Sequence, residues 1–172
     1  RARDVATALR TPVNTTAVLP VGFGTAPVHL TADPEKYVNK PVICYSWDEA
    51  VSALGYSEDW DKYTLCEAMY SEFKLYAASP IVFVNVLDPK THKKSTTSKS
   101  VTLTDASTTV TDPVILSTLK VRSTEAAQPA KEGTDYTAAW NDDGQLVITV
   151  VTSGTLAAAK TVLLDYDAVD PT

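Results

Sequence analysis

Residues 41–89 constrain the fold more than any other part of this 172-residue chain. Continuous apolar runs occupy residues 41–45 and 81–87, and such runs are typical of strands in a sheet that helices cover on both faces. Two helical patterns separate the runs. The order strand, helix pair, strand predicts an α/β unit in which a right-handed crossover joins the two strands.

The two helices are indicated by different signals. Ser46 and Glu49 have the spacing of a capping box, in which each side chain satisfies a free backbone N–H. This helix is expected to end near Gly55. A second helix is expected over residues 59–78, where apolar residues repeat at helical spacing and Pro80 ends the pattern. The repeating residues are Leu65, Met69, Phe73 and Ala77.

The pattern changes after Pro89. Residues 90–100 are polar and of low complexity, which is typical of a linker between domains. Residues 101–172 alternate between apolar and polar positions, as strands with one wet face do. Asp143-Gly144 between two apolar runs predicts a hairpin turn. Strands are expected at 101–104, 118–122, 136–140, 146–151 and 161–166, with turns at 131–135, 141–144 and 153–155.

These patterns predict an α+β fold: a small α/β unit, with a sheet covered by two helices, followed by an antiparallel β-sandwich or barrel-like module. The expected divisions are an extended amino-terminal arm (1–17), the α/β domain (18–89), the linker (90–100) and the β-rich inserted domain (101–172).

Composition excludes some classes of function. The net charge of −6 argues against binding to a nucleic acid, which requires Lys and Arg to neutralise phosphates. No apolar run approaches the roughly 20 residues that cross a bilayer, so no membrane partner is expected. Cys44 and Cys66 lack metal or redox spacing and are interpreted as reduced thiols in the core.

No catalytic, cofactor or metal site is predicted. His29 and His92 have no G-x-S-x-G element to complete a hydrolase triad. Residues 141–144 lack the alternating ligands and the distal glutamate of a calcium loop. Residues 22–24 hold two glycines after a strand, but neither a third glycine nor a Gly-Lys-Ser/Thr ending follows them. The three tryptophans are interpreted as packing residues.

Several segments, taken in order, resemble the amino-terminal part of contractile tail sheath proteins of phages, prophages and phage-tail-like bacteriocins. The similar segments are residues 19–28, 53–57, 60–65 and 80–89, with 133–137 and 162–167 similar to an inserted β-rich domain of such sheaths. No single motif is specific, and the resemblance lies in the ordered series. Because family members usually continue into a carboxy-terminal assembly domain, this chain is expected to be a fragment of a longer protein.

The resemblance implies a structural subunit and not an enzyme. Many copies would form stacked rings around an inner tail tube protein, together with baseplate and tail terminator proteins. The particle would be a virion tail assembled in the bacterial host cytoplasm. Contraction would use the free-energy difference between two packings of the same subunits.

The arm at residues 1–17 is the candidate assembly element. Residues 11–16 favour an extended chain, and so short a segment cannot bury enough apolar surface to order itself. The resemblance implies that the arm pairs with strands of neighbouring subunits. The residues assigned to this contact are Arg3, Val5, Thr7 and Leu9. Two alternatives stay open: a β-sandwich that binds carbohydrate or a receptor, and a small nucleotide-binding enzyme that uses residues 22–25 as an anion loop.

Overall fold

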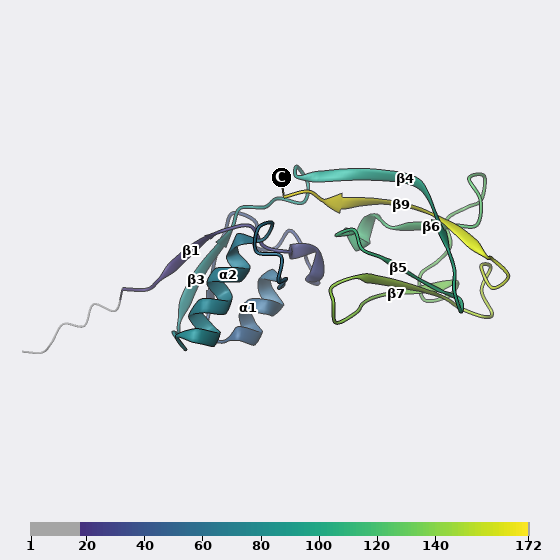
Figure 1. The fold of residues 1–172 in the computed structure, drawn as a ribbon. Coiled ribbons are helices and arrows are strands. Elements are labelled where there is room, and N and C mark those ends of the chain that lie inside the picture. Colours follow the sequence, from purple (N-terminus) through teal and green to yellow (C-terminus); the bar gives the residue numbers. More distant parts are fainter. Residues whose placement is uncertain (1–17, 172) are drawn as a thin grey trace, which may run out of the picture.

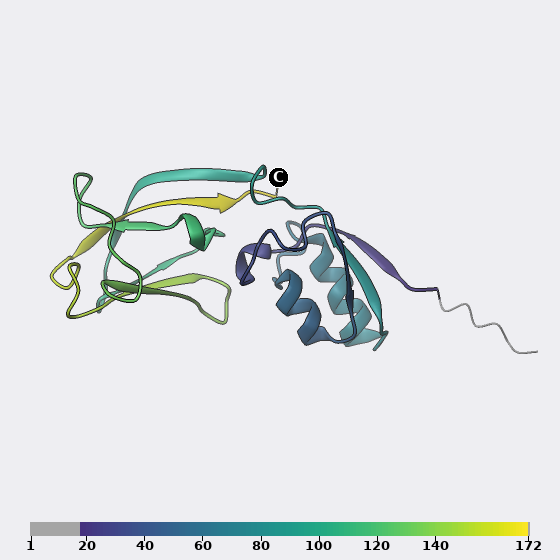
Figure 2. The same cartoon turned by 180° about the vertical axis from the view of Figure 1, so that it is seen from behind.

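The computed structural model describes residues 18–171, and the fold is mixed α+β, with three small sheets and two α-helices among these residues. The elements gather into two bodies joined near residues 88–92 (Figure 1). We refer to residues 18–87 as the α/β unit and to residues 93–169 as the β module. Figure 2 shows the same two bodies from behind, with both helices in the α/β unit.

The sheet of the α/β unit consists of β1 (Val21–Gly24), β2 (Pro41–Cys44) and β3 (Ile81–Asn85), in the order β1-β3-β2. Strand β1 is parallel to β3, whereas β2 is antiparallel to β3. The expected right-handed crossover between parallel strands is therefore wrong for β2 and β3. Each of the two helices between them reverses the chain direction, so a helix pair returns the chain antiparallel where a single helix would have returned it parallel.

Helix α1 (Trp47–Leu54) has the predicted capping contacts. The Ser46 side chain accepts a hydrogen bond from the Glu49 N–H, and the Glu49 carboxylate accepts one from the Tyr45 N–H. Gly55 ends the helix with φ of +76°. A Cβ atom there would lie 2.4 Å from the carbonyl oxygen of Pro27, so both the conformation and the space require glycine.

Helix α2 (Thr64–Tyr70) is shorter than the expected range of 59–78 and continues as a π-helical turn, η2 (Ser71–Leu75). Asp59 instead accepts hydrogen bonds from the backbone N–H and the side chain of Lys62 in the turn before the helix. At the other end, Ala77 has φ of +51°, which a helix does not allow.

Both helices pack on one face of the sheet, while the opposite face has no cover among the described residues. The packed face holds Cys44, Ile81 and Phe83 from the strands against Leu54 and Leu65 from the helices. The expectation of helices on both faces is therefore wrong. Alternation along the strands places six residues on the other face. Val21, Phe23, Pro41 and Ile43 of the two edge strands are exposed there, whereas Val84 and Val82 of the central strand are half-buried and buried, respectively.

The β module contains two three-stranded antiparallel sheets, β4-β9-β6 and β5-β8-β7. Val121, Leu146, Ile148, Val162 and Leu164 from these sheets share one buried core. The strands are β4 (Lys93–Thr102), β5 (Ser107–Val110), β6 (Lys120–Arg122), β7 (Tyr136–Trp140), β8 (Leu146–Val150) and β9 (Thr161–Val169). A 3-10 turn, η3 (Leu116–Thr118), also lies in this module, whereas the 3-10 turn η1 (Val28–Leu30) belongs to the α/β unit.

The predicted hairpin at residues 141–144 is confirmed. It joins β7 to β8, and Gly144 has φ of +71°. Strand β5 follows Asp105 and Ala106, which both have positive φ. The sequence patterns do not predict this strand, because three of its residues are polar.

Residues 90–100 are not an unstructured linker, because β4 begins at Lys93 and pairs with β9 over most of its length. Lysine and serine side chains along an edge strand keep it from pairing with other chains. The polar composition thus reflects an exposed edge position and not an absence of structure.

Cys44 and Cys66 are both buried and free, as predicted. Among residues 18–171, no helix has the length and apolar character needed to cross a membrane.

Candidate functional site: an acidic cleft between the two bodies

Two separate contacts join the α/β unit to the β module. The first is an apolar joint of buried side chains: Tyr63, Cys66 and Leu87 from the α/β unit meet Ile115 and Val169 from the β module. The second contact involves the β7–β8 hairpin, where a Cβ atom at Gly144 would lie 3.7 Å from the Leu30 side chain. A cleft of about 770 Å³ is lined by residues of both bodies around these contacts.

His29 lies at the second contact. Its ring centroid is 5.9 Å from that of Tyr63 and 5.5 Å from that of Trp140, so the imidazole packs between aromatic rings of the two bodies. The residue is only 5% exposed, and its Nδ1 atom has no hydrogen-bond partner among the described residues. Burial lowers the pKa of His29 to about 4, so the ring is neutral at pH 7.

Carboxylates outnumber cationic side chains along the walls of the cleft, where Lys62 and Lys94 are the lysines. Glu58 contributes a carboxylate from the α/β unit, and the exposed Asp142 and Asp143 contribute two from the tip of the β7–β8 hairpin. None of these three carboxylates forms an ion pair with another described residue. Asp59 and Asp112 also line the cleft, but each has a cationic partner.

Asp112 belongs to a small network at the wall formed by the β module. Its carboxylate accepts hydrogen bonds from the Lys99 ammonium group, at 2.8 Å, and from the Tyr166 hydroxyl. These donors, Lys99 first, hold the pKa of Asp112 below its ordinary value. The cleft therefore has both neutralised carboxylates and carboxylates without a partner.

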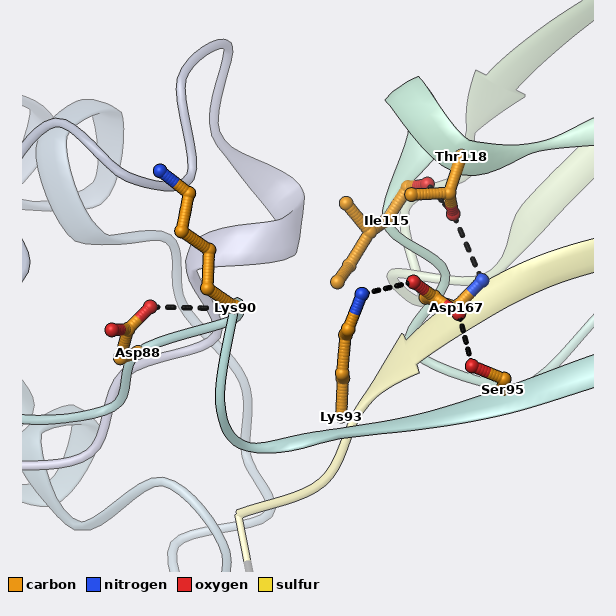
Figure 3. A network of polar contacts seen from close by, with 7 residues as sticks. All are labelled: Asp88, Lys90, Lys93, Ser95, Ile115, Thr118 and Asp167. Atoms are coloured by element: carbon orange, nitrogen blue, oxygen red, sulfur yellow. Dashed lines mark hydrogen bonds and ion pairs between the residues drawn. The ribbon is translucent and has the colours of Figure 1, made fainter.

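The junction that carries the β module is held by Asp167 on β9 (Figure 3). Its carboxylate accepts hydrogen bonds from Lys93 and Ser95 on β4, and its backbone N–H donates to the Thr118 hydroxyl at 2.8 Å. The Lys93 contact is the largest cause of a lowered Asp167 pKa. Asp88 turns the chain into β4 by accepting a hydrogen bond from the backbone N–H of Lys90.

The residues singled out from the sequence do not meet at one site. Arg3, Val5, Thr7 and Leu9 lie outside the described residues. His92 contacts Thr91 and the Asp88 carbonyl at the junction, whereas His29 lies at the cleft.

Gly22 and Gly24 lie inside β1 and not in a loop. A Cβ atom at Gly24 would lie 2.4 Å from the Thr64 Oγ1 atom, so this glycine allows helix α2 to approach the sheet. No group of three or more possible metal ligands occurs among residues 18–171.

The sequence did not indicate the cleft, because its walls come from residues far apart in the chain. Only the hairpin signal at residues 141–144 pointed to one wall, and that signal predicts a turn without saying what the turn faces. His29 carries no local motif that distinguishes it from an ordinary buried residue.

Comparison with known proteins gives no relatives: no protein-family model, no curated protein and no solved structure matches the chain.

Proposed function

We propose that this chain is a structural subunit of a contractile tail sheath, which polymerises around an inner tube and contracts to drive that tube through a target cell envelope. The ordered series of segments that resembles sheath proteins supports this proposal. So does the distribution of apolar surface on the molecule.

The observation that carries the proposal is the confinement of large exposed apolar side chains to the α/β unit. All of those found among the described residues lie between residues 18 and 86, and none lies on the β module. They are Val18, Leu19, Val21, Phe23, Ile43, Tyr45, Tyr70, Leu75, Tyr76 and Val86. An exposed apolar area confined to one body is typical of a protein–protein interface.

The bare face of the sheet provides the centre of such an interface. Phe23, which is 69% exposed, lies beside Val84, and Ile43 lies beside Val82, so apolar side chains run across all three strands. Burying a side chain of this size stabilises a complex by about 1.5–3 kcal/mol. A few such residues per contact suffice for stacked rings in which every subunit makes many contacts.

In this proposal the β module is a sandwich-like decoration that faces outward, and the α/β unit faces the neighbouring subunits. The arm at residues 1–17 pairs with a strand of a neighbour through Arg3, Val5, Thr7 and Leu9, which share one face when the chain is extended. The other partners are the inner tail tube, baseplate and tail terminator proteins, and the location is the virion tail. The subunit does no chemistry.

The test combines negative-stain microscopy with sedimentation. Phe23→Asp and Ile43→Asp place charges on the bare face, where they should abolish assembly while leaving the monomer folded, since both residues are at least half exposed. Thr109→Asp is the matched control, because Thr109 is an exposed strand residue of the β module. Because the chain is expected to be a fragment, the variants are made in the full-length parent protein. A parent that never forms tubes, or variants of both kinds that assemble like the parent, would contradict the proposal.

A further inference from the structure

We infer that His29 makes the position of the β module sensitive to pH: in mild acid the β7–β8 hairpin leaves the α/β unit, and the module swings about the apolar joint. The inference goes beyond the proposed function, because the motion occurs within a single chain whether or not tubes form.

One contact between the two bodies lies at their covalent junction, and the other lies away from it. Leu87 of the apolar joint directly precedes the junction at residues 88–92, and Val169 of the same joint is the last residue of β9. The β7–β8 hairpin faces η1 on the side of the molecule away from that junction (Figure 1), and Figure 2 shows the same arrangement from behind. The joint can therefore serve as a hinge when the hairpin contact opens.

The His29 ring fills the hairpin contact. It packs between Tyr63 of the α/β unit and Trp140 of β7, it is buried, and its Nδ1 atom has no hydrogen-bond partner among the described residues. A charged imidazole in this place would be a buried cation whose Nδ1 proton has no acceptor, which costs free energy. Moving the hairpin away from η1 returns the ring to water, and it leaves the hydrophobic cores of both bodies intact.

Charged groups on the elements that pack against His29 do not account for its neutrality. They are Glu58, Asp59 and Lys62 in the segment before α2, and Asp142 and Asp143 at the hairpin tip, while Lys94, Asp112 and Asp170 of the β module line the same cleft. Carboxylates would raise the pKa of the imidazole and ammonium groups would lower it, whereas burial is the only cause of its fall to about 4. Tyr63 stays neutral, because burial raises its pKa to about 12.

The size of the effect follows from two pKa values of His29: about 4 in the closed form, and the ordinary 6.5 once the ring is in water. Protonation then favours the open form about twentyfold more at pH 5 than at pH 7. Ordinary carboxyl groups titrate near pH 4, so imidazole is the side chain that changes its charge in this window. The chain has one other imidazole, that of His92 at the junction.

Fluorine NMR of the full chain labelled with 5-fluorotryptophan tests the inference, since the three tryptophans lie in different places. Trp140 reports on the hairpin contact, Trp60 on the apolar joint and Trp47 on the core of the α/β unit. We expect saturation transfer to detect a second, solvent-exposed state of Trp140. The ratio of this state to the main state should rise about twentyfold from pH 7 to pH 5, while Trp47 and Trp60 keep their resonances.

His29→Phe keeps an aromatic ring at the contact but takes up no proton, so it should abolish this pH dependence. His92→Gln is the matched control, because it removes the other imidazole and should leave the pH dependence unchanged. If His29→Phe fails to fold in a thermal melt, the uncharged His29→Gln replaces it. The inference is overturned if Trp140 shows no second state between pH 7 and pH 5, if all three resonances change together as in global unfolding, if the His29 variant responds to pH like the original protein, or if His92→Gln abolishes the response.

Discussion

Replacing His29 with Phe should make folding stability less sensitive to mild acid. The buried imidazole has a pKa of about 4 in the folded protein against an ordinary value of 6.5. Between these two values the unfolded chain takes up a proton that the folded chain does not. The free energy of unfolding therefore falls as the pH falls through this window, and it is unaffected by His29 above pH 6.5.

The magnitude follows from the two pKa values. Relative to neutral pH, the protonation of His29 in the unfolded chain removes about 2 kcal/mol of stability at pH 5 and about 3 kcal/mol below pH 4. Phe retains the aromatic contacts with Tyr63 and Trp140 and has no nitrogen to leave without a partner. At pH 7 the variant should accordingly be within about 1.5 kcal/mol of the original protein.

Urea unfolding at pH 7 and pH 5, followed by tryptophan fluorescence, measures both quantities. Protonation of carboxylates with lowered pKa values, such as Asp112 and Asp167, also lowers the free energy of unfolding in acid, but it does so in both proteins. The difference between the two proteins therefore isolates His29. Equal losses of stability in the original protein and in His29→Phe between pH 7 and pH 5 would refute the argument that burial of this ring sets the acid sensitivity.

Three further predictions concern the scaffold. Asn85→Leu should destabilise the protein by about 3 kcal/mol in urea unfolding. The fully buried Asn85 side chain hydrogen-bonds two backbone N–H groups and one backbone carbonyl, and all three would lose their partner. An unchanged urea midpoint of unfolding would contradict this. Asp135→Asn should destabilise the protein at pH 7, and progressively less toward pH 3. Backbone hydrogen bonds hold the pKa of Asp135 low, so the stability that its carboxylate contributes is lost as the pH falls through that pKa. A constant difference between variant and original protein from pH 7 to pH 3 would argue against this. Trypsin should cleave after Lys160, in the exposed turn before β9, before it cleaves after Lys94 or Lys99. Those two lysines lie in β4, which is paired with β9. If mass spectrometry shows that the first cleavage falls within β4, residues 90–100 behave as a linker.

Local signals predicted the elements whose stability is local. The cap at Ser46, the end of α1 at Gly55 and the hairpin at residues 141–144 all depend on contacts within a few residues, and the structure has each of them. Pairing direction depends on the path of the chain through space. The apolar runs of β2 and β3 are equally compatible with parallel and antiparallel neighbours, and the helix pair between them decides for the antiparallel arrangement.

The polar strand β4 illustrates a second limit. Composition alone does not separate a solvated linker from an edge strand that owes its order to its neighbour. Lys93 and Ser95 are ordered because Asp167, more than seventy residues away, accepts hydrogen bonds from both. The cleft was beyond prediction for the same reason, since it exists only where the two bodies face each other.

The way the β module is attached explains how one chain can combine an apolar assembly face with an independent outer part. Lys93, at the start of β4, pairs with Val169, at the end of β9, and the N–H of Asp170 bonds the carbonyl of His92. The two ends of the module therefore lie side by side, and the module has its own buried core. Changes within the module need not alter the sheet that bears Phe23 and Ile43. The apolar joint and the contacts of the β7–β8 hairpin with His29 and Leu30 couple the two bodies, and they help to set the orientation of the module on the α/β unit.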